Sequence, residues 1–189
     1  MEVLIMSKKI NVATREFNAV SLQGWINENE SKLQPPVNNK EMFPGSNMIV
    51  MMVGGPNRRR DFHISPAEEF FYQIKGDCYV EIINDEGKRE VVTVKEGEVF
   101  MLPSNVPHSP HRVADTIGMV IEEQRGEGVE EHMVWFCDEC DHEMHRVTLE
   151  LTDIATQLKA AIEEFNGSKE LRTCENCNHV MSEEIGLWK

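Results

Sequence analysis

Four cysteines in the second half of the chain stand in two CxxC pairs. Cys137 and Cys140 form the first pair, and Cys174 and Cys177 form the second. Two thiolates separated by two residues have the bite that tetrahedral coordination needs, so the four cysteines together predict a closed structural metal site. Both Zn²⁺ and iron fit four sulfur ligands, and the spacing does not separate them. Thiol redox chemistry is the weaker interpretation, because neither pair lies in the βαβ setting of a disulfide oxidoreductase.

A second group of ligand-type residues lies in the middle of the chain. His63 precedes Glu69 across a Ser65-Pro66 interruption, and His108 follows in the segment GEVFMLPSNVPHSPHR. Two strand-borne segments separated by a hairpin can converge on one interior point of a small β barrel. Such convergence would make a metal site. For any one of these histidines alone, the alternative is an ordinary interior or surface side chain.

Arginines flank both histidine-bearing segments at an even spacing. Arg59 stands four residues before His63, and Arg112 stands four residues after His108. An even offset along an unbroken strand keeps side chains on one face, so both guanidinium groups would face the metal cavity. There they could bind a carboxylate through two parallel hydrogen bonds. The alternative for the run RRR around Arg59 is a solvated basic loop.

Glu122 follows an apolar strand in the segment GMVIEEQ. If Met119 and Ile121 pack on one side of that strand, Glu122 shares the other face with Val120. A surface position is the default for an isolated glutamate, and the adjacent Glu123 is our candidate for that role.

Three further residues have no partners at a useful spacing. Cys78 lies within an apolar run and is expected to be a small buried side chain. His111 and His132 are expected at the surface.

The elements that must position these residues are predominantly β. From about residue 48 to 124, glycine, proline and asparagine separate six short apolar runs: MIVMMV, EFFYQIKG, CYVEII, REVVTV, EVFMLP and GMVIEEQ. Such a series predicts a closed or sandwiched antiparallel β domain. Helical spacing of apolar residues predicts one helix over residues 18–34 and a second after Thr152, its N-cap, that ends at Gly167. The apolar face of the second helix should be covered by the β domain.

Length and charge limit the class of protein. The 189 residues allow one full-sized domain and a small appendage, which we place at residues 1–130 (helix and barrel) and 131–189 (cysteine-rich extension). The formal charge of −14 opposes attraction to nucleic acid and to anionic membranes. No apolar run approaches the roughly 18 residues that span a bilayer, so we expect a cytoplasmic protein without disulfides.

The middle of the chain resembles the cupin superfamily. Its two motifs are matched by Glu69, Gly76, Gly97 and Pro103, with His108 at the second motif's histidine. This register selects Glu69 over Glu68 as the ligand. Many cupins carry His-x-His in the first motif, whereas this chain has DFH ending at His63. The resemblance therefore implies two imidazoles and one carboxylate, a set that suits Fe(II) and leaves positions for substrate and O₂.

A longer resemblance covers roughly residues 18–180. The strings VGGPNRRRDFHISPAEEFFYQIKGD, EGEVFMLPSNVPHSPHR and VIEEQR, followed by WFCDECDHEMHRV and CENC, resemble the bacterial and fungal-type 3-hydroxyanthranilate 3,4-dioxygenase family. The resemblance implies a mainly β fold: a cupin (double-stranded β-helix, or jelly-roll) barrel with an N-terminal helix, a small C-terminal helix and a rubredoxin-like metal module. It also implies a homodimer.

The same resemblance implies a non-haem Fe(II) extradiol-type dioxygenase. Such an enzyme opens the ring of 3-hydroxyanthranilate with O₂ to give 2-amino-3-carboxymuconate semialdehyde, the precursor of quinolinate. The context would be tryptophan catabolism through kynurenine, NAD biosynthesis or nitroaromatic degradation. By this resemblance, His63, Glu69 and His108 would bind the iron, and Arg59 and Arg112 would bind the substrate's carboxylate. Glu122 would contact the substrate and transfer a proton, and Asn39 would lie in a loop over the site. Structural Fe or Zn would be held by Cys137, Cys140, Cys174 and Cys177.

Two alternatives remain open at this point. Another cupin metalloenzyme, whether a dioxygenase or an isomerase, would keep the three ligands and need no paired arginines. A non-enzymatic cupin that binds an acidic small molecule would keep the arginines and need no open iron.

Overall fold

The computed structural model describes residues 19–35, 38–57, 59–150 and 154–183. The chain divides into two compact units, residues 1–30 and 31–189. The first contains helix α1 (Leu22–Asn29), after which the short 3₁₀ helix η2 (Glu30–Lys32) leads into the second. The second unit contains both β-sheets and helix α2 (Ile154–Gly167). No helix in these described ranges is long and apolar enough to cross a membrane.

Helix α1 begins where Ser21 caps it. The Ser21 hydroxyl accepts a hydrogen bond from the Gly24 N–H at 3.2 Å, which satisfies one of the free N–H groups of the first turn. Gln23 donates to Asn27 one turn later at 2.9 Å. The helix expected over residues 18–34 is therefore present over a shorter range.

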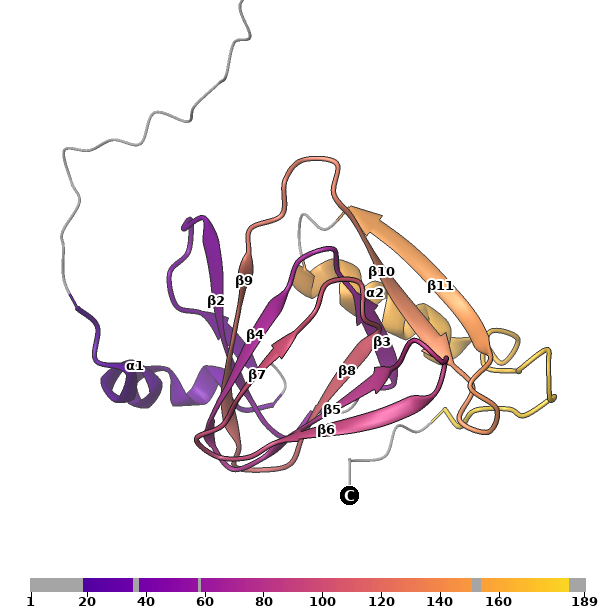
Figure 1. Ribbon diagram of the computed structural model, residues 1–189, viewed down its shortest axis with the longest axis horizontal. Coiled ribbons are helices and arrows are strands. Elements are labelled where there is room, and N and C mark those ends of the chain that lie inside the picture. The colour runs from indigo at the N-terminus through magenta and orange to yellow at the C-terminus, as the bar shows by residue number, and fades with distance from the viewer. Residues whose placement is uncertain (1–18, 36–37, 58, 151–153, 184–189) are drawn as a thin grey trace, which may run out of the picture. The chain divides into compact units, whose positions relative to one another are not determined.

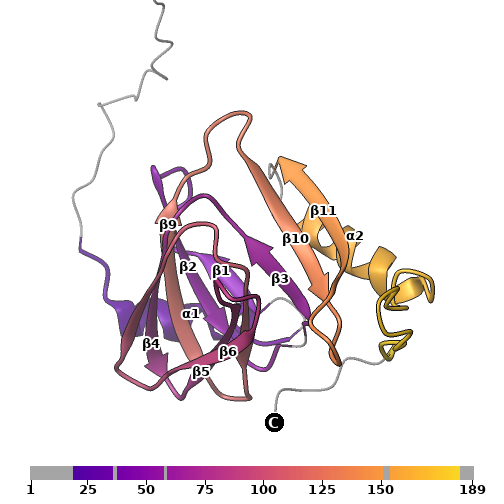
Figure 2. The same ribbon diagram turned by 45° about the vertical axis from the view of Figure 1, so that its right-hand side comes forward.

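Two antiparallel sheets face each other across the barrel (Figures 1 and 2). The five-stranded sheet runs, in spatial order, β1 (Asn39–Glu41), β2 (Met48–Gly54), β9 (Ile117–Glu123), β4 (Glu69–Lys75) and β7 (Val99–Leu102). The six-stranded sheet runs β11 (Glu143–Glu150), β10 (Glu130–Phe136), β3 (Asp61–Ile64), β8 (His108–Arg112), β5 (Cys78–Ile83) and β6 (Arg89–Val94). Neighbours such as β2 and β9 are distant in sequence, as in a jelly roll.

The barrel core is filled from both sheets. Phe71, Leu102 and Val120 project from the five-stranded sheet, and Val80 and Val94 project from the six-stranded sheet, into one buried cluster. The six predicted apolar runs each form a strand, because their alternate residues supply this core. The mainly β cupin jelly roll expected from the sequence is confirmed. Strands β1, β3, β8, β10 and β11 lie outside the six predicted runs.

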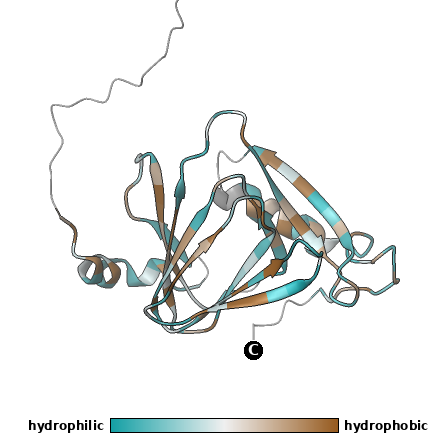
Figure 3. Cartoon of the chain, viewed as in Figure 1, coloured by the Kyte–Doolittle hydropathy of each residue, from teal (hydrophilic) through white to brown (hydrophobic). Residues whose placement is uncertain are grey.

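Helix α2 packs against β10 and β11. The Trp135 and Phe165 rings stack with their centroids 4.7 Å apart, and Met133, Ala161 and Met181 complete this buried cluster. Hydrophobic and hydrophilic bands alternate along β11 (Figure 3), as expected for a strand with one covered face. The β domain thus covers the apolar face of α2, as predicted, while the expected N-cap Thr152 lies outside the described residues.

The division of the chain at residue 130 stays a prediction. Strand β10 starts at Glu130 and pairs with β3 in the six-stranded sheet, so the first residues of the expected extension are part of the barrel wall.

Arg89 joins the barrel to the first cysteine loop. Its guanidinium binds the carboxylate of Asp141, that of Glu81 at 3.0 Å, and the carbonyls of Phe136 and Cys137 at 3.1 and 3.2 Å. The nearby carboxylates outweigh the effect of burial and raise the pKa of Arg89. This one side chain therefore satisfies backbone and carboxylate oxygens from three segments.

We expect Arg89→Ala to lower the free energy of unfolding by about 2 kcal/mol, since hydrogen bonds to charged groups contribute about 1.5–3 kcal/mol. Urea denaturation followed by tryptophan fluorescence would measure the loss. The matched control is Lys88→Ala, which removes an ion pair with Glu86; both side chains of this pair are about 70% exposed. Lys88→Ala should lower the free energy of unfolding by less than about 1 kcal/mol. Equal losses for the two variants would contradict the bridging role of Arg89.

Candidate active site

His63, Glu69 and His108 meet inside the barrel. His63 on β3 and His108 on β8 are directly paired in register, which puts both side chains on one face. Glu69 begins β4 on the opposite sheet, and its Oε1 lies 3.5 Å from His63 Nδ1 and 3.2 Å from His108 Nε2. The three ligand-type atoms all lie within 4.8 Å of one another. The structure therefore brings together the three residues that the sequence singled out.

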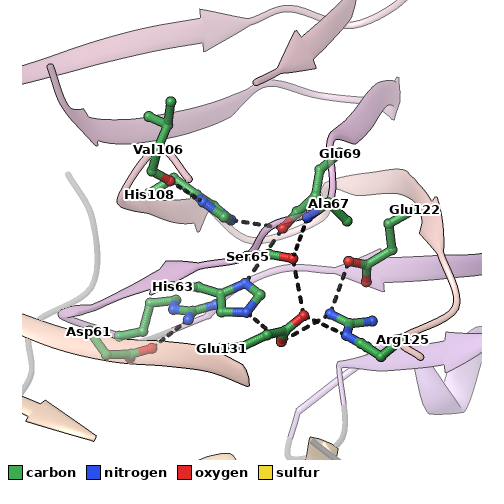
Figure 4. A network of polar contacts seen from close by, with 11 residues as sticks. Asp61, His63, Ser65, Ala67, Glu69, Val106, His108, Glu122, Arg125 and Glu131 are labelled. Atoms are coloured by element: carbon green, nitrogen blue, oxygen red, sulfur yellow. Dashed lines mark hydrogen bonds and ion pairs between the residues drawn. The ribbon is translucent and has the colours of Figure 1, made fainter. Parts of the chain in front are cut away.

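The second nitrogen of each ring is held by another group (Figure 4). His108 Nδ1 lies 3.0 Å from the carbonyl of Val106, which can only accept a proton. His63 Nε2 lies 2.9 Å from Glu131 Oε2. In the neutral rings, both contacts place the ring proton away from Glu69, so the lone pairs of His63 Nδ1 and His108 Nε2 face its carboxylate. Such outer contacts fix the orientation of metal-binding histidines.

The local electrostatics favour a positive charge between these three residues. Burial by itself lowers the pKa of His63, but the hydrogen bond with Glu131 and the negative charges of Glu69 and Glu131 outweigh it and raise the pKa to about 9. Burial raises the pKa of Glu69, yet the two imidazoles hold it well below its usual range. Glu69 Oε1 is buried and has no hydrogen-bond partner within the described ranges. Two imidazole nitrogens and a buried carboxylate oxygen fit a divalent transition-metal ion.

The three residues line a cavity of about 670 Å³. Its walls carry the apolar side chains Met51, Val53, Phe71, Val120, Leu158 and Ile162. The last two come from α2, so both sheets and the C-terminal helix line the cavity. An apolar chamber with a few convergent charged groups is typical of a small-molecule site.

Arg59 and Arg112 both line this cavity. Arg112 is 2% exposed, and its backbone N–H donates to Asn57 Oδ1 at 2.6 Å, which fixes the end of β8. The Nε atoms of both arginines are buried without a hydrogen-bond partner in the described part of the chain. Arg59 also forms an ion pair with the buried Asp61, a contact that the sequence analysis missed. Two guanidinium groups that line a cavity and each keep a buried N–H without a partner fit an anionic ligand.

Gly118 on β9 leaves room for the Arg112 side chain. A Cβ atom at this position would lie 2.6 Å from Gln73 Oε1 and 3.4 Å from Arg112 Nη2. A side chain here would therefore displace one or both neighbours.

Glu122 and Val120 line the cavity together, as their shared face on β9 predicts. Arg125 Nη2 donates to Glu122 Oε2 at 2.9 Å. Burial, reinforced by the charge of Glu69, raises the pKa of Glu122, although Arg125 opposes the shift. Glu123 is exposed, as expected.

Glu131 and Arg125 are two polar residues of this region that the sequence patterns do not single out. Glu131 is 1% exposed, and both of its oxygens accept hydrogen bonds. One signal was available: Glu131 lies two residues before Met133 and four before Trp135, so it shares the face of the strand that carries these buried side chains.

Two expectations are corrected. Asn39 is the first residue of β1, paired with Val53, and not part of a loop; its exposed side chain does line the cavity. His111 is 5% exposed and not a surface residue, because its Nε2 lies 3.2 Å from Glu81 Oε2. Cys78 is buried, as expected.

The four cysteines of the two pairs also meet. Their Sγ atoms lie 3.5 to 3.7 Å apart for Cys140–Cys177, Cys137–Cys177 and Cys140–Cys174. Each pair sits in the same kind of turn, closed by Asp141 N–H to Cys137 O at 3.1 Å and by Asn178 N–H to Cys174 O at 2.8 Å. Two matched turns that present four thiols to one point fit a tetrahedral metal site.

A jelly-roll barrel with a histidine–carboxylate cluster in its cavity defines a cupin with a candidate catalytic metal centre. The family model for 3-hydroxyanthranilic acid dioxygenase matches residues 15–166. The chain is 61% identical over 176 residues to "3-hydroxyanthranilate 3,4-dioxygenase" of Bacillus thuringiensis (strain Al Hakam), covering 93% of this chain and 98% of the relative. It is 47% identical to the protein of the same name from Meyerozyma guilliermondii, with 82% and 91% covered.

Among solved structures, a cupin-2 domain containing protein from Shewanella frigidimarina is similar, with a TM-score of 0.42 and 17% identity, covering 53% of this chain and 92% of that one. The chain belongs to the 3-hydroxyanthranilic acid dioxygenase family. It is therefore a dioxygenase of the cupin fold, which sets aside the non-enzymatic alternative.

We expect the two clusters to hold metal independently. His108→Ala should remove the ion of the barrel cluster and leave that of the cysteine cluster, while Cys177→Ser should do the reverse, because no ligand is shared. Elemental analysis of the purified variants by mass spectrometry measures both. Cys78→Ala, which changes a buried cysteine outside both clusters, should retain both ions. Simultaneous loss of both ions in His108→Ala would contradict independent sites.

Proposed function

We propose that this chain opens the ring of 3-hydroxyanthranilate with O₂ and produces 2-amino-3-carboxymuconate semialdehyde, the reaction for which its relatives are named. The observation that carries the proposal is one cavity that holds both a His–Glu–His cluster and two arginines with buried, unmatched N–H groups. The cluster suits a redox-active metal, and the arginines suit the substrate's carboxylate. A metal-dependent isomerase would have no need of the second feature.

The resident metal of the barrel is Fe(II) in this proposal, held by His63, Glu69 and His108. Two neutral imidazoles and one carboxylate on one face are the ligand set of non-haem Fe(II) oxygenases and leave positions free for substrate and O₂. When bound, the iron supplies a path for electron density from the aromatic ring to O₂.

Arg59 and Arg112 bind the substrate's carboxylate. This contact orients the ring, so that the adjacent hydroxyl and amino groups face the His–Glu–His cluster. Phe71 and Val120 contact the ring and exclude water from it. Asn39, at the exposed side of the cavity, contacts the substrate from the start of β1.

Glu122 takes the proton of the substrate's hydroxyl. Arg125 holds Oε2 of this carboxylate, so Oε1 is the atom that accepts the proton. Burial raises the pKa of Glu122 toward the range in which a carboxylate serves as a general base. Loss of the proton makes the aminophenol ring electron-rich, and the ring then opens beside the hydroxyl-bearing carbon.

The remaining features of the proposal rest on family membership. The product cyclises to quinolinate, which places the enzyme in tryptophan breakdown through kynurenine, in NAD biosynthesis or in nitroaromatic degradation. The cysteine cluster holds structural Fe or Zn within the extension formed by residues 131–189. The enzyme acts in the cytoplasm as a homodimer.

Removal of one arginine should separate substrate binding from metal binding. We expect Arg112→Ala to raise KM about 10- to 100-fold, because a charge-assisted hydrogen bond contributes about 1.5–3 kcal/mol, while the iron content stays at the wild-type level. Oxygen uptake with 3-hydroxyanthranilate measures KM. The KM of Arg112→Lys should lie between those of the wild type and Arg112→Ala. Arg146→Ala, which changes a surface pair with Glu143, should leave KM unchanged. An unchanged KM in Arg112→Ala would overturn the carboxylate site.

Loss of the proposed base should affect turnover and not binding. We expect Glu122→Gln to lower kcat by about 10²- to 10⁴-fold, the usual contribution of general base catalysis. Oxygen uptake at saturating 3-hydroxyanthranilate measures kcat, and Glu123→Gln is the control on the same strand. A normal kcat in Glu122→Gln would show that another group takes the proton.

A further inference from the structure

A buried pair of charges lies behind the His–Glu–His cluster, outside the proposed ligands. Glu131 on β10 is 1% exposed, and Arg125 lies in the connection from β9 to β10 with 10% of its side chain exposed. Arg125 Nε donates to Glu131 Oε1 at 2.7 Å. Figure 4 shows the pair between His63 and Glu122. Burying a charged pair is costly unless its hydrogen bonds are well matched, so the pair needs an explanation.

Glu131 decides which nitrogen of His63 carries the proton. A carboxylate only accepts hydrogen bonds, so His63 Nε2, at 2.9 Å from Oε2, must be the N–H. In the neutral ring, which is the form that binds a metal, Nδ1 then has a lone pair, and this nitrogen faces Glu69 Oε1 at 3.5 Å. The other tautomer would put an N–H where the proposed metal binds. Ser65, through its hydroxyl at 3.0 Å from Oε1, helps to hold Glu131 in place.

Arg125 connects this carboxylate to Glu122. The same guanidinium donates through Nε to Glu131 Oε1 and through Nη2 to Glu122 Oε2, at 2.7 and 2.9 Å. One planar group therefore sets the positions of two carboxylates relative to each other. A lysine has a single ammonium group and lacks this fixed fork, so it would not reproduce the arrangement.

The strands explain why the four residues meet. His63 pairs with Met133 of β10, and Glu131 lies two residues from Met133, on the same face of the strand. Glu122 lies near the end of β9, from which the chain passes through Arg125 into β10. The connection between these strands thus places the Arg125 guanidinium between Glu122 and Glu131, the carboxylate that is hydrogen-bonded to His63.

We infer that Glu131 and Arg125 are positioning residues. Glu131 presents His63 Nδ1 to the metal, and Arg125, held in place by its hydrogen bond to Glu131, directs Glu122 toward the substrate. The inference rests on the proposed function for the role of Glu122, and on geometry alone for His63. Neither residue touches the reacting atoms in this scheme.

The role of Glu131 is tested on metal affinity, which needs no substrate. We expect Glu131→Gln and Glu131→Ala to raise the dissociation constant for Fe(II) at the barrel site about 10- to 100-fold, as is usual when the outer partner of a metal-bound histidine is lost. The measurement is anaerobic equilibrium dialysis of the full chain with Fe(II), its cysteine site loaded. Glu131→Asp should recover part of the affinity, and Glu130→Gln, at an exposed neighbour on the same strand, should keep all of it.

Two outcomes would overturn this part of the inference. One is wild-type Fe(II) affinity in folded Glu131→Gln and Glu131→Ala. The other is a loss of affinity in Glu130→Gln equal to that in Glu131→Gln. Urea denaturation of each variant establishes that the protein is folded.

The role of Arg125 is tested by a double-mutant cycle. We expect Arg125→Lys to lower kcat about tenfold or more with KM within a factor of two, since Arg59 and Arg112 still bind the carboxylate. In a Glu122→Gln background the same substitution should change kcat less than twofold, because residues that act through one another are not additive. An equal reduction in both backgrounds would show that Arg125 does not act through Glu122.

The two arms separate this inference from the proposed function. If wild-type protein consumes no oxygen with 3-hydroxyanthranilate while Glu131→Gln still weakens Fe(II) binding, the proposed reaction fails and the role of Glu131 stands. If the wild type is active and Glu131→Gln binds Fe(II) normally, the reaction stands and the role of Glu131 fails.

Discussion

Three atoms with lone pairs converge on one buried point, and most of the barrel interior follows from that convergence. His63 Nδ1, His108 Nε2 and Glu69 Oε1 lie close together because both ring protons are taken up elsewhere, by Glu131 and by the carbonyl of Val106. Such an arrangement is unfavourable unless a cation lies at its centre. The register of β3 with β8 and the buried acids behind them all serve to hold a positive charge at this position.

Charge is arranged in opposite senses on the two sides of the cavity. Around His63, negative groups predominate: Glu69 lies beside its ring, and Glu122 and Glu131 share the guanidinium of Arg125. Beyond them, Arg59 and Arg112 face the same space with N–H groups that the described residues leave unmatched. A ligand that is anionic at one end and able to bind a metal at the other fits this polarity. The apolar walls between the two sides suit an aromatic ring.

Local patterns predicted what depends on local chemistry. The six apolar runs became strands because alternation within a run decides which side chains are buried. Each CxxC pair presents its two thiols together because its turn is set by its own residues. Glu131 was missed because its burial depends on pairing between β10 and β3, which are far apart in sequence. His111 was misplaced for a similar reason: its partner Glu81 lies on a neighbouring strand.

Leu158 and Ile162 give helix α2 a part in the cavity that its place in the sequence does not suggest. The helix lies between the two cysteine pairs, so the segment that carries this apolar wall is anchored at both ends by thiols that gather at one point. Substitutions on the inner face of α2 can therefore reshape the chamber while every strand of the barrel stays unchanged. Within the family, selectivity for ring substituents can diverge through this helix without altering the metal-binding residues.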